Sequence, residues 1–311
     1  MLHVVHHPDY QAPLRADHRF PMSKYGYLRA ALVRRGLIAP GRYLAPAQAT
    51  AGQLALAHDA GYVDRVLSQR LSEAEIKRIG LPGTERVARR ARLASAGTWL
   101  AALVALEQGI AANSAGGSHH AGPEGGAGFC VFNDVAVAVR NLQVQGQVIG
   151  RSPGGRAAAP RILIVDCDVH QGDGSARVFA GDDTVFTFSI HAANNYPLAK
   201  ATSDLDVALA DGLGDEGYLA ALGEGLSRAL AAVGRPAIAF YNAGVDVWEG
   251  DRLGRLKLTL AGIRARDALV IGRLRGLGIP TVCVIGGGYD RDPARLAERH
   301  AIVFEEAARF A

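Results

Sequence analysis

Apolar, strand-like runs alternate with helix-like segments through most of this chain. The pattern predicts strands at residues 2–6, 162–168, 185–191, 237–244 and 281–285. It predicts helices at residues 25–35, 60–69, 84–107, 176–180, 216–232 and 259–277. This rhythm indicates βαβ units, and hence an α/β fold with a mostly parallel sheet and helices on both faces. Ligands of such sheets bind beyond the carboxyl ends of the strands, so the functional site is expected there.

Length and composition favour one ordinary globular domain. At 311 residues the chain can bury a core without disulfides or structural metals, and 49% of its residues are hydrophobic. We expect a single domain over residues 1–311, with the Gly/Pro/Arg stretch 150–156 as a surface loop inside it. Three widely spaced cysteines (Cys130, Cys167 and Cys283) predict a reducing, cytoplasmic setting. We expect neither a signal peptide nor a membrane span.

The net charge of +4 is carried mostly by arginine, and the densest basic stretch lies in the predicted helix 84–107. It comprises Arg86, Arg89, Arg90 and Arg92. A solvated helix face is the favoured interpretation, and a docking patch for acidic or nucleic-acid partners is the alternative. No basic groove with interleaved aromatic residues and no zinc-finger spacing supports nucleic-acid recognition.

A metal site is predicted at the end of the strand 162–168. The run 166–174 reads Asp-Cys-Asp-Val-His-Gln-Gly-Asp-Gly, and residues two apart on a strand share a face. Asp168 and His170 can therefore face one ion, with Asp166 behind them. Asp246, which follows another apolar strand, would be the third ligand and would leave a position open for water. These donors suit zinc, or Fe2+ or Co2+ in its place.

Two adjacent histidines, His119 and His120, lie in a glycine-bracketed loop. A histidine that transfers protons near neutral pH needs its second ring nitrogen held by a carboxylate or carbonyl. We expect Asp166 to hold His119 and Asp173 to hold His120. The sequence does not assign which imidazole is the base and which the acid.

Two glycine-rich segments have different interpretations. The run 286–289 is Gly-Gly-Gly-Tyr, and the hydroxyl of Tyr289 can donate a hydrogen bond to an oxygen that becomes negative in a tetrahedral intermediate. The run 212–217 matches a dinucleotide-binding pattern, but the preceding residues 204–209 make a poor buried strand. We therefore expect 212–217 to be a loop that enters a helix.

Five stretches resemble the histone deacetylase superfamily, which has the arginase/deacetylase fold. They are residues 116–120 (Gly-Gly-Ser-His-His), 128–134 (Gly-Phe-Cys-Val-Phe-Asn-Asp), 166–174, 242–246 (Asn-Ala-Gly-Val-Asp) and 286–289. Residues 18–25 and 249–254 are similar to the bacterial and class IV-type branch. The resemblance covers nearly the whole chain and rests on highly specific motifs.

The resemblance implies a zinc-dependent deacylase that hydrolyses the amide of N-acetyl or other N-acyl lysine, or of a small acylated amine. It implies zinc ligands at Asp168, His170 and Asp246, a catalytic dyad of His119 and His120 supported by Asp166 and Asp173, and a polarising Tyr289. It implies a substrate channel walled by Gly128, Phe129, Tyr196 and Leu253. It implies structural potassium near Asp166, Asp168, His170, Ser189 and Ile190, and a second such site near Phe179, Asp182 and Val185. The acidic gatekeeper of acetylpolyamine-specific relatives is missing.

Two other function classes compete with this prediction. A two-metal ureohydrolase of the same fold would carry carboxylates two residues after each of His170 and Asp246, where Gly172 and Trp248 stand. A catalytically inactive acyl-lysine binding module would have lost a ligand, a histidine or the tyrosine. The sequence leaves the acyl length, the oligomeric state and the partner proteins open.

Overall fold

The computed structural model describes residues 1–15, 17–39, 41–146 and 161–311. Seven strands form one sheet in the order β1-β2-β7-β6-β3-β4-β5, and every pair of neighbours is parallel. The strands are β1 (His3–Val5), β2 (Ile110–Asn113), β3 (Ile162–Asp166), β4 (Val185–Ala192), β5 (Leu205–Leu209), β6 (Ile238–Asn242) and β7 (Thr281–Val284). The predicted α/β class is confirmed. The predicted loop 150–156 lies outside the described residues.

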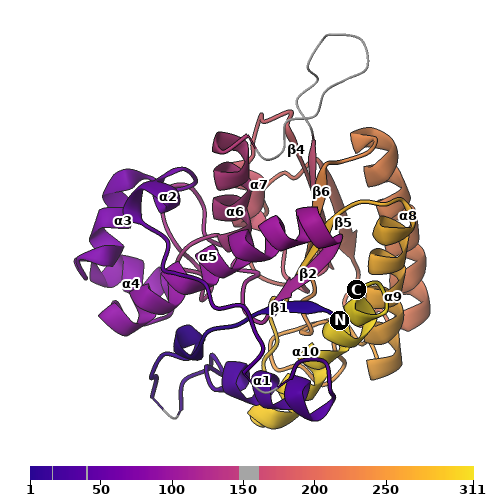
Figure 1. Cartoon of the computed structure of the whole chain (residues 1–311), viewed down its shortest axis with the longest axis horizontal. Coiled ribbons are helices and arrows are strands. Elements are labelled where there is room, and N and C mark those ends of the chain that lie inside the picture. Colours follow the sequence, from indigo (N-terminus) through magenta and orange to yellow (C-terminus); the bar gives the residue numbers. More distant parts are fainter. Residues whose placement is uncertain (16, 40, 147–160) are drawn as a thin grey trace.

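Helices cover both faces of the sheet (Figure 1). The long helix α5 packs on β1, β2, β6 and β7 with α6 against it, whereas α8, α9 and α10 pack on β2, β3, β4, β5 and β7 from the other side. The helices are α1 (Lys24–Arg34), α2 (Ala51–Ala55), α3 (Ala60–Leu67), α4 (Glu73–Ile79), α5 (Glu85–Gln108), α6 (Asp134–Val144), α7 (Asp173–Val178), α8 (Asp215–Val233), α9 (Leu260–Gly276) and α10 (Pro293–Ala308).

The centre of the sheet explains the continuous apolar runs in the sequence. Every residue of β3 and of β6 is buried, because both strands are covered on two faces and paired on both edges. Their carboxyl ends lie side by side, with Asp166 opposite Asn242. The loops that follow β3, β6 and β7 therefore begin at one edge of the sheet.

The expectation that residues 204–209 make a poor buried strand agrees with the structure, although a strand does form there. Residues Leu205–Leu209 form β5, the edge strand beside β4. Only its two end residues are buried, because an edge strand at the rim of the sheet needs fewer apolar side chains. The expected loop before α8 is present, since α8 begins at Asp215.

The predicted solvated face of arginines on α5 is wrong in large part. Arg90 is buried, and it donates to the Tyr10 carbonyl at 3.1 Å. Arg89 pairs with Asp9 at 2.7 Å, and Arg92 donates to a backbone carbonyl of the segment before α2. These guanidinium groups fasten neighbouring segments to α5, so they do not form a free docking patch.

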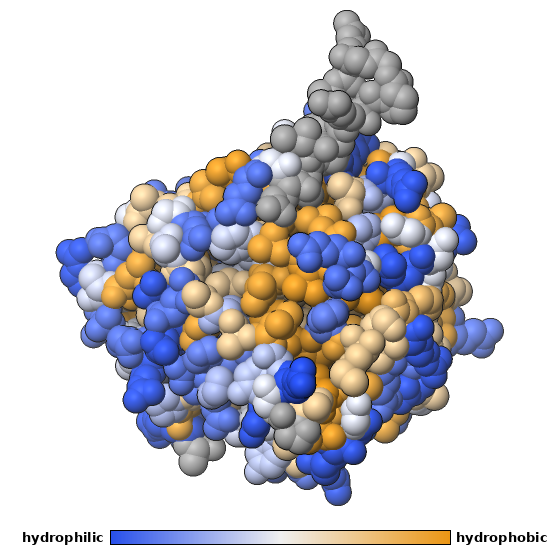
Figure 2. All heavy atoms as spheres, in the orientation of Figure 1, coloured by the Kyte–Doolittle hydropathy of each residue, from blue (hydrophilic) through white to orange (hydrophobic). Residues whose placement is uncertain are grey.

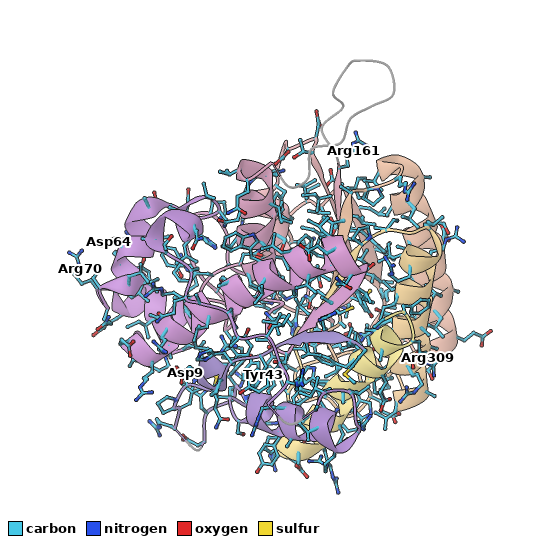
Figure 3. All side chains as sticks on the ribbon, viewed as in Figure 1. Asp9, Tyr43, Asp64, Arg70, Arg161 and Arg309 are labelled. Atoms are coloured by element: carbon cyan, nitrogen blue, oxygen red, sulfur yellow. The ribbon has the colours of Figure 1, made fainter. Side chains whose placement is uncertain are left out.

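The surface otherwise follows the usual division of polar and apolar residues. Figure 2 shows polar side chains around the periphery of one face and apolar side chains gathered near its middle. Figure 3 shows Asp64, Arg70 and Arg309 directed outward from the ribbon. Among the described residues, no helix combines the length and apolar character needed to cross a bilayer.

His58 is a buried histidine that the fold holds in its neutral form. Its Nδ1 lies 2.9 Å from the Gly122 carbonyl oxygen, and its Nε2 accepts from the backbone N–H of Asn133 at 2.9 Å. Nε2 therefore carries no proton, and Nδ1–H is the donor to Gly122. Burial lowers the pKa of His58 to about 4, although the Gly122 hydrogen bond partly opposes this shift.

We expect the free energy of unfolding to fall as the pH is lowered from 6.5 towards 4. The unfolded chain binds a proton at His58 in this window and the folded chain does not, so the loss approaches about 3 kcal/mol. Urea unfolding at several pH values measures it. The His58→Asn variant keeps a donor near Gly122 but cannot titrate, so its stability should depend less on pH. An unchanged slope in that variant would assign the dependence to other groups.

Candidate active site

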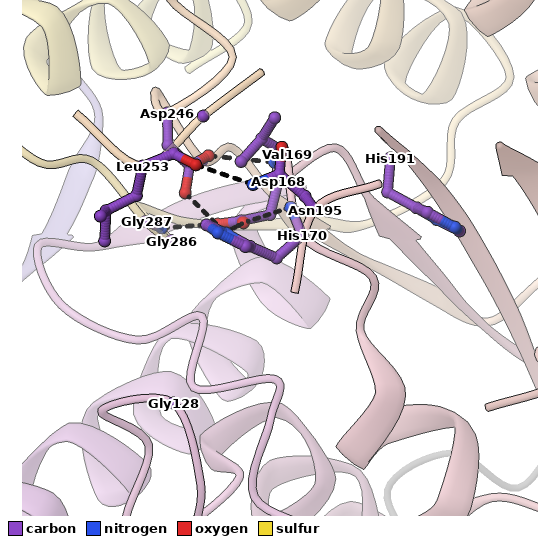
Figure 4. A network of polar contacts seen from close by, with 12 residues as sticks. Gly128, Asp168, Val169, His170, His191, Asn195, Asp246, Leu253, Gly286 and Gly287 are labelled. Atoms are coloured by element: carbon purple, nitrogen blue, oxygen red, sulfur yellow. Dashed lines mark hydrogen bonds and ion pairs between the residues drawn. The ribbon is translucent and has the colours of Figure 1, made fainter. Parts of the chain in front are cut away.

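Three side chains converge beyond the carboxyl ends of β3 and β6, as Figure 4 shows. Asp168 and His170 follow β3, and Asp246 follows β6. One potential ligand atom from each of these three lies within 4.8 Å of the other two. His170 Nδ1 is 3.0 Å from Asp168 Oδ1 and 3.2 Å from Asp246 Oδ2. His191 points away from this group (Figure 4).

Backbone hydrogen bonds fix the two carboxylates. Val169 N–H donates to Asp246 Oδ1 at 3.0 Å, and Gly287 N–H donates to Asp168 Oδ2 at 2.7 Å. A Cβ on Gly287 would lie 2.0 Å from Asp246 Oδ2, so only glycine can approach this closely. Each carboxylate keeps its other oxygen directed at His170. The two carboxylates are thus fixed by the backbone, and they in turn orient His170.

The charge at this point favours a cation. Burial raises the pKa of the Asp246 carboxyl, and the nearby Asp168 charge raises it further. Burial also opposes the charge on His170, but Asp168 and Asp246 outweigh it and raise its pKa to about 10. Two carboxylates and one imidazole, all buried, form a donor set that a divalent metal ion fits.

Each member of the adjacent histidine pair is held by its own carboxylate. His119 Nδ1 lies 2.6 Å from Asp166 Oδ2, and His120 Nδ1 lies 2.6 Å from Asp173 Oδ1. These are the two contacts expected from the sequence. The two imidazole centres are 4.1 Å apart, and His119 Nε2 lies 3.8 Å from Asp168 Oδ1. Both Nδ1 atoms are therefore engaged, which leaves the Nε2 atoms for chemistry.

The two histidines differ in their electrostatic surroundings. Burial lowers the pKa of His119, but the charges of Asp166 and Asp168 outweigh burial and raise it to about 9. Burial and the neighbouring His119 lower the pKa of His120 to about 4, against the opposing effect of Asp173. A cation between Asp168 and Asp246 would neutralise part of the charge that raises the pKa of His119.

Tyr289 lies near His170 and Phe129. Its ring centre is 6.3 Å from that of His170 and 5.9 Å from that of Phe129. Burial raises the pKa of the Tyr289 hydroxyl well above 10, and the charges of Asp246 and Asp168 add to this effect. The phenol therefore keeps its proton and is available as a hydrogen-bond donor.

The loop carrying the histidines and the loop carrying Tyr289 meet backbone to backbone. A Cβ on Gly117 would lie 2.5 Å from the Cα atom of Gly286, and both residues have positive φ angles of 81° and 58°. A side chain at either position would strain the backbone, and one at Gly117 would also push against Gly286 and separate the loops. This contact sets the spacing between the histidine pair and the phenol.

Two residues that the sequence did not single out hold the tyrosine loop. Asp251 Oδ2 accepts from Tyr289 N–H at 2.7 Å, and its Oδ1 accepts from Leu253 N–H at 2.8 Å. Lys24 is only 1% exposed, and its Nζ donates to the Gly286 carbonyl at 3.2 Å. Burial lowers the pKa of Lys24 to about 8, with Arg90 contributing. In the sequence, only the family resemblance of residues 18–25 and 249–254 pointed to Lys24 and Asp251.

A cavity of about 890 Å³ opens above the group. His120, His170 and Tyr289 line its floor, and all four predicted channel residues (Gly128, Phe129, Tyr196 and Leu253) line its walls. Tyr196 stands edge-on to His120 with 4.8 Å between ring centres.

Phe129 projects into the same cavity from a constrained turn. It has φ +66°, which is strained for a residue other than glycine, and its N–H donates to the Ile79 carbonyl at 2.7 Å. This hydrogen bond holds the Phe129 side chain in its place on the wall.

The residues predicted for potassium lie in two places. Asp166 and Ser189 are register partners on β3 and β4, and Ile190 follows Ser189. The second set lies in the turn from α7 to β4: Asp182 N–H donates to the Phe179 carbonyl at 3.0 Å, and Val185 N–H donates to the Asp182 carbonyl at 3.1 Å. The Asp182 side chain pairs with Arg140.

Comparison with solved structures identifies the fold. The crystal structure of the HDA15 HD domain matches with a TM-score of 0.80 and 25% identity, and the match covers 100% of this chain and 88% of that chain. The all-parallel sheet and its helices therefore define an arginase/deacetylase-like α/β protein.

Sequence comparison gives the family. The histone deacetylase domain model matches residues 18–305. An uncharacterized protein of Picosynechococcus sp. is 44% identical over 304 residues, covering 98% of this chain and 97% of that protein. Histone deacetylase 2 of Arabidopsis thaliana is 31% identical over 289 residues, covering 90% of this chain and 71% of the relative. The chain belongs to the histone deacetylase family.

Proposed function

We propose that this chain is a zinc-dependent deacylase that hydrolyses the amide of N-acetyl or other N-acyl lysine, or of a related acylated amine. One observation carries the proposal. The Asp168, His170 and Asp246 group reaches the large cavity through His170, which lines it together with Tyr289 and His120, one of the two carboxylate-supported histidines. These are the parts that metal-assisted amide hydrolysis requires.

Asp168, His170 and Asp246 would hold the metal ion. Their two oxygens and one nitrogen suit zinc, and Fe2+ or Co2+ could take its place. When bound, such an ion polarises the acyl oxygen and lowers the pKa of water towards ~7.

The chain's own groups would then handle the proton and the developing charge. The Nε2 atoms of His119 and His120 take the proton of the attacking water and return one to the leaving amine, while Asp166 and Asp173 keep both Nδ1–H groups oriented. The Tyr289 hydroxyl donates to the acyl oxygen as that oxygen becomes negative. The apolar walls exclude bulk water, which strengthens these interactions.

Two rival functions fit the described residues less well. A second metal of the ureohydrolase type would need a carboxylate at Gly172, where even a Cβ would lie 2.3 Å from Asp166 Oδ2. The other position is occupied by Trp248, which stacks on the Arg299 guanidinium at 4.0 Å. An inactive binding module has no need of two histidines that are each held by a carboxylate.

The proposal also includes two potassium sites and a cytoplasmic location. We place one potassium ion among Asp166, Asp168, His170, Ser189 and Ile190, with several of them binding through backbone carbonyls, and a second at the turn from α7 to β4. Cys130, Cys167 and Cys283 are all free and buried, which supports a reducing cytoplasm.

A metal titration with an acetyl-lysine peptide tests the proposed function. The chelated protein is reloaded with zinc, Fe2+, Co2+ or Mn2+, and release of acetate and of urea from matched substrates is measured. One equivalent of metal with acetate release is expected. Urea release with two equivalents of Mn2+ would instead establish the ureohydrolase, and peptide binding without hydrolysis would establish the binding module.

Asp251 should affect turnover although it does not contact the metal group. In Asp251→Asn only one side-chain oxygen remains to accept a backbone hydrogen bond. The amide NH₂ group that replaces the other oxygen would face the N–H of Tyr289 or of Leu253. We expect kcat to fall about tenfold with KM little changed, and unfolding to cost about 1–3 kcal/mol less. Steady-state kinetics and thermal unfolding measure both. Glu249→Gln, a change to an exposed carboxylate two residues away, is the matched control and should alter neither quantity.

A further inference from the structure

The mouth of the cavity is strongly basic. Five cationic side chains and one carboxylate line it: Arg15, Arg19, Lys77, Arg78 and Arg255, and Asp17. All six are exposed. The cations come from three separate segments of the chain, so they surround the opening rather than extend along one helix face.

Each basic segment adjoins a wall of the channel. Arg78 directly precedes Ile79, whose carbonyl accepts from Phe129 N–H at 2.7 Å. Arg255 follows the wall residue Leu253 by two positions. Arg19 lies between His18 and Phe20, whose rings are 6.1 Å and 5.5 Å from that of Phe129. The charges are therefore placed where the part of a substrate outside the channel would lie.

Most of this charge is not neutralised by the protein itself. Arg15 pairs with Asp17, and Arg255 pairs with Asp211. In the described part of the chain, Arg19, Lys77 and Arg78 pair with no carboxylate, and Arg78 donates only to the Gly126 carbonyl at 3.0 Å. Lys200, on the segment that follows Tyr196, also donates only to backbone carbonyls.

We propose that the preferred substrates are acyl-lysine peptides with acidic residues on both sides of the modified lysine. This inference rests on the proposed deacylase function and names its substrate class. The acyl group and the lysine side chain enter the channel, and the flanking peptide stays at the mouth among the cations. Carboxylates there are attracted, whereas lysine- and arginine-rich flanks of the kind found in histone tails are repelled.

Three peptides of equal length test the proposal, with acetyl-lysine flanked by Asp and Glu, by Gly and Ser, or by Lys and Arg. Free Nε-acetyl-lysine is a fourth substrate, which shows whether one α-carboxylate is enough. At low salt we expect kcat/KM for the acidic peptide to be about tenfold above the neutral peptide and about a hundredfold above the basic one. In 0.5 M NaCl the differences should shrink to about twofold to threefold.

The double variant Lys77→Gln/Arg19→Gln should lose most of this preference, because its KM for the acidic peptide rises. Arg78 is left intact because it holds the Gly126 carbonyl. Arg228→Gln on α8, outside the cavity, is the matched control and should keep the full preference. Thermal unfolding checks that every variant is folded. Equal kcat/KM for all three peptides, or a preference retained in the double variant, overturns the inference.

Fluorescence anisotropy with the same peptides separates this inference from the proposed function. Absence of turnover with every peptide would defeat the deacylase proposal, yet the order of the dissociation constants would still report on flank charge. Tighter binding of the acidic peptide supports the inference, and equal binding of all three rejects it. Strong preference for free Nε-acetyl-lysine over every peptide also rejects it, because one amino acid would then suffice.

Discussion

Replacing Tyr289 with phenylalanine is expected to lower kcat by about a hundredfold or more while the fold and the metal content stay unchanged. In the proposed mechanism the hydroxyl donates to the developing oxyanion, and losing one such donor typically costs a factor of ~10²–10³. The aromatic ring, which packs 5.9 Å from Phe129, is retained in the variant. Turnover of an acetyl-lysine peptide, metal analysis and circular dichroism measure the three properties.

Tyr196→Phe is the matched control for this experiment. Tyr196 also lines the cavity, but it is 43% exposed and stands edge-on to His120. Losing its hydroxyl should change kcat by no more than about twofold. Full activity of Tyr289→Phe would remove the phenol from the mechanism, and equal losses in both variants would point to a general effect on the channel.

Asp246→Asn is expected to abolish tight metal binding and with it nearly all turnover, by on the order of a thousandfold or more. The free energy of unfolding of the metal-free protein, in contrast to turnover, should not fall. Burial and the nearby Asp168 charge raise the pKa of Asp246, so the ionised pair is unfavourable without a cation. The amide oxygen can still accept from Val169 N–H. We therefore expect the metal-free variant to be at least as stable as the metal-free parent.

Thermal unfolding with and without zinc measures this difference. At free zinc a thousandfold above Kd, the parent should gain about 4 kcal/mol, and the variant should gain far less. Asp64→Asn, at an exposed site in Figure 3, should behave like the parent. Stoichiometric, tight zinc in the Asp246→Asn variant would exclude Asp246 as a ligand.

The sequence predicted most of the sheet because its central strands carry an unmistakable pattern. β3 and β6 are buried along their whole length and therefore consist almost entirely of apolar residues. Helix starts were also predicted well where a threonine caps them: Thr84 accepts from Val87 N–H and Thr259 from Gly262 N–H. The predicted helix 176–180 begins earlier in the structure, at Asp173.

Other elements lacked such a pattern. β2 is short and contains two alanines, which do not signal a strand. α10 buries three polar side chains (Arg299, His300 and Glu306), and these interrupt its apolar stripe. α2, α4 and α6 were not predicted either.

The candidate site likewise contains residues that the sequence predicted and residues that it did not. Chemical need was enough to pair His119 with Asp166 and His120 with Asp173, since each imidazole requires a carboxylate. Lys24 could not be predicted, because its partner Gly286 is 262 positions away and a lysine is ordinarily solvated. The basic mouth was also missed, because its cations come from separate segments that only the tertiary fold brings together.

The backbone contact between Gly117 and Gly286 makes position 117 a simple diagnostic. A methyl group at Gly117 would press on the Gly286 backbone and on the Asn242 side chain, and would thereby move the phenol relative to the imidazoles. Proteins of this fold that carry a larger residue there should hydrolyse acylated peptides poorly. The residue at this one position would then help to separate active hydrolases from proteins that have kept only the pocket.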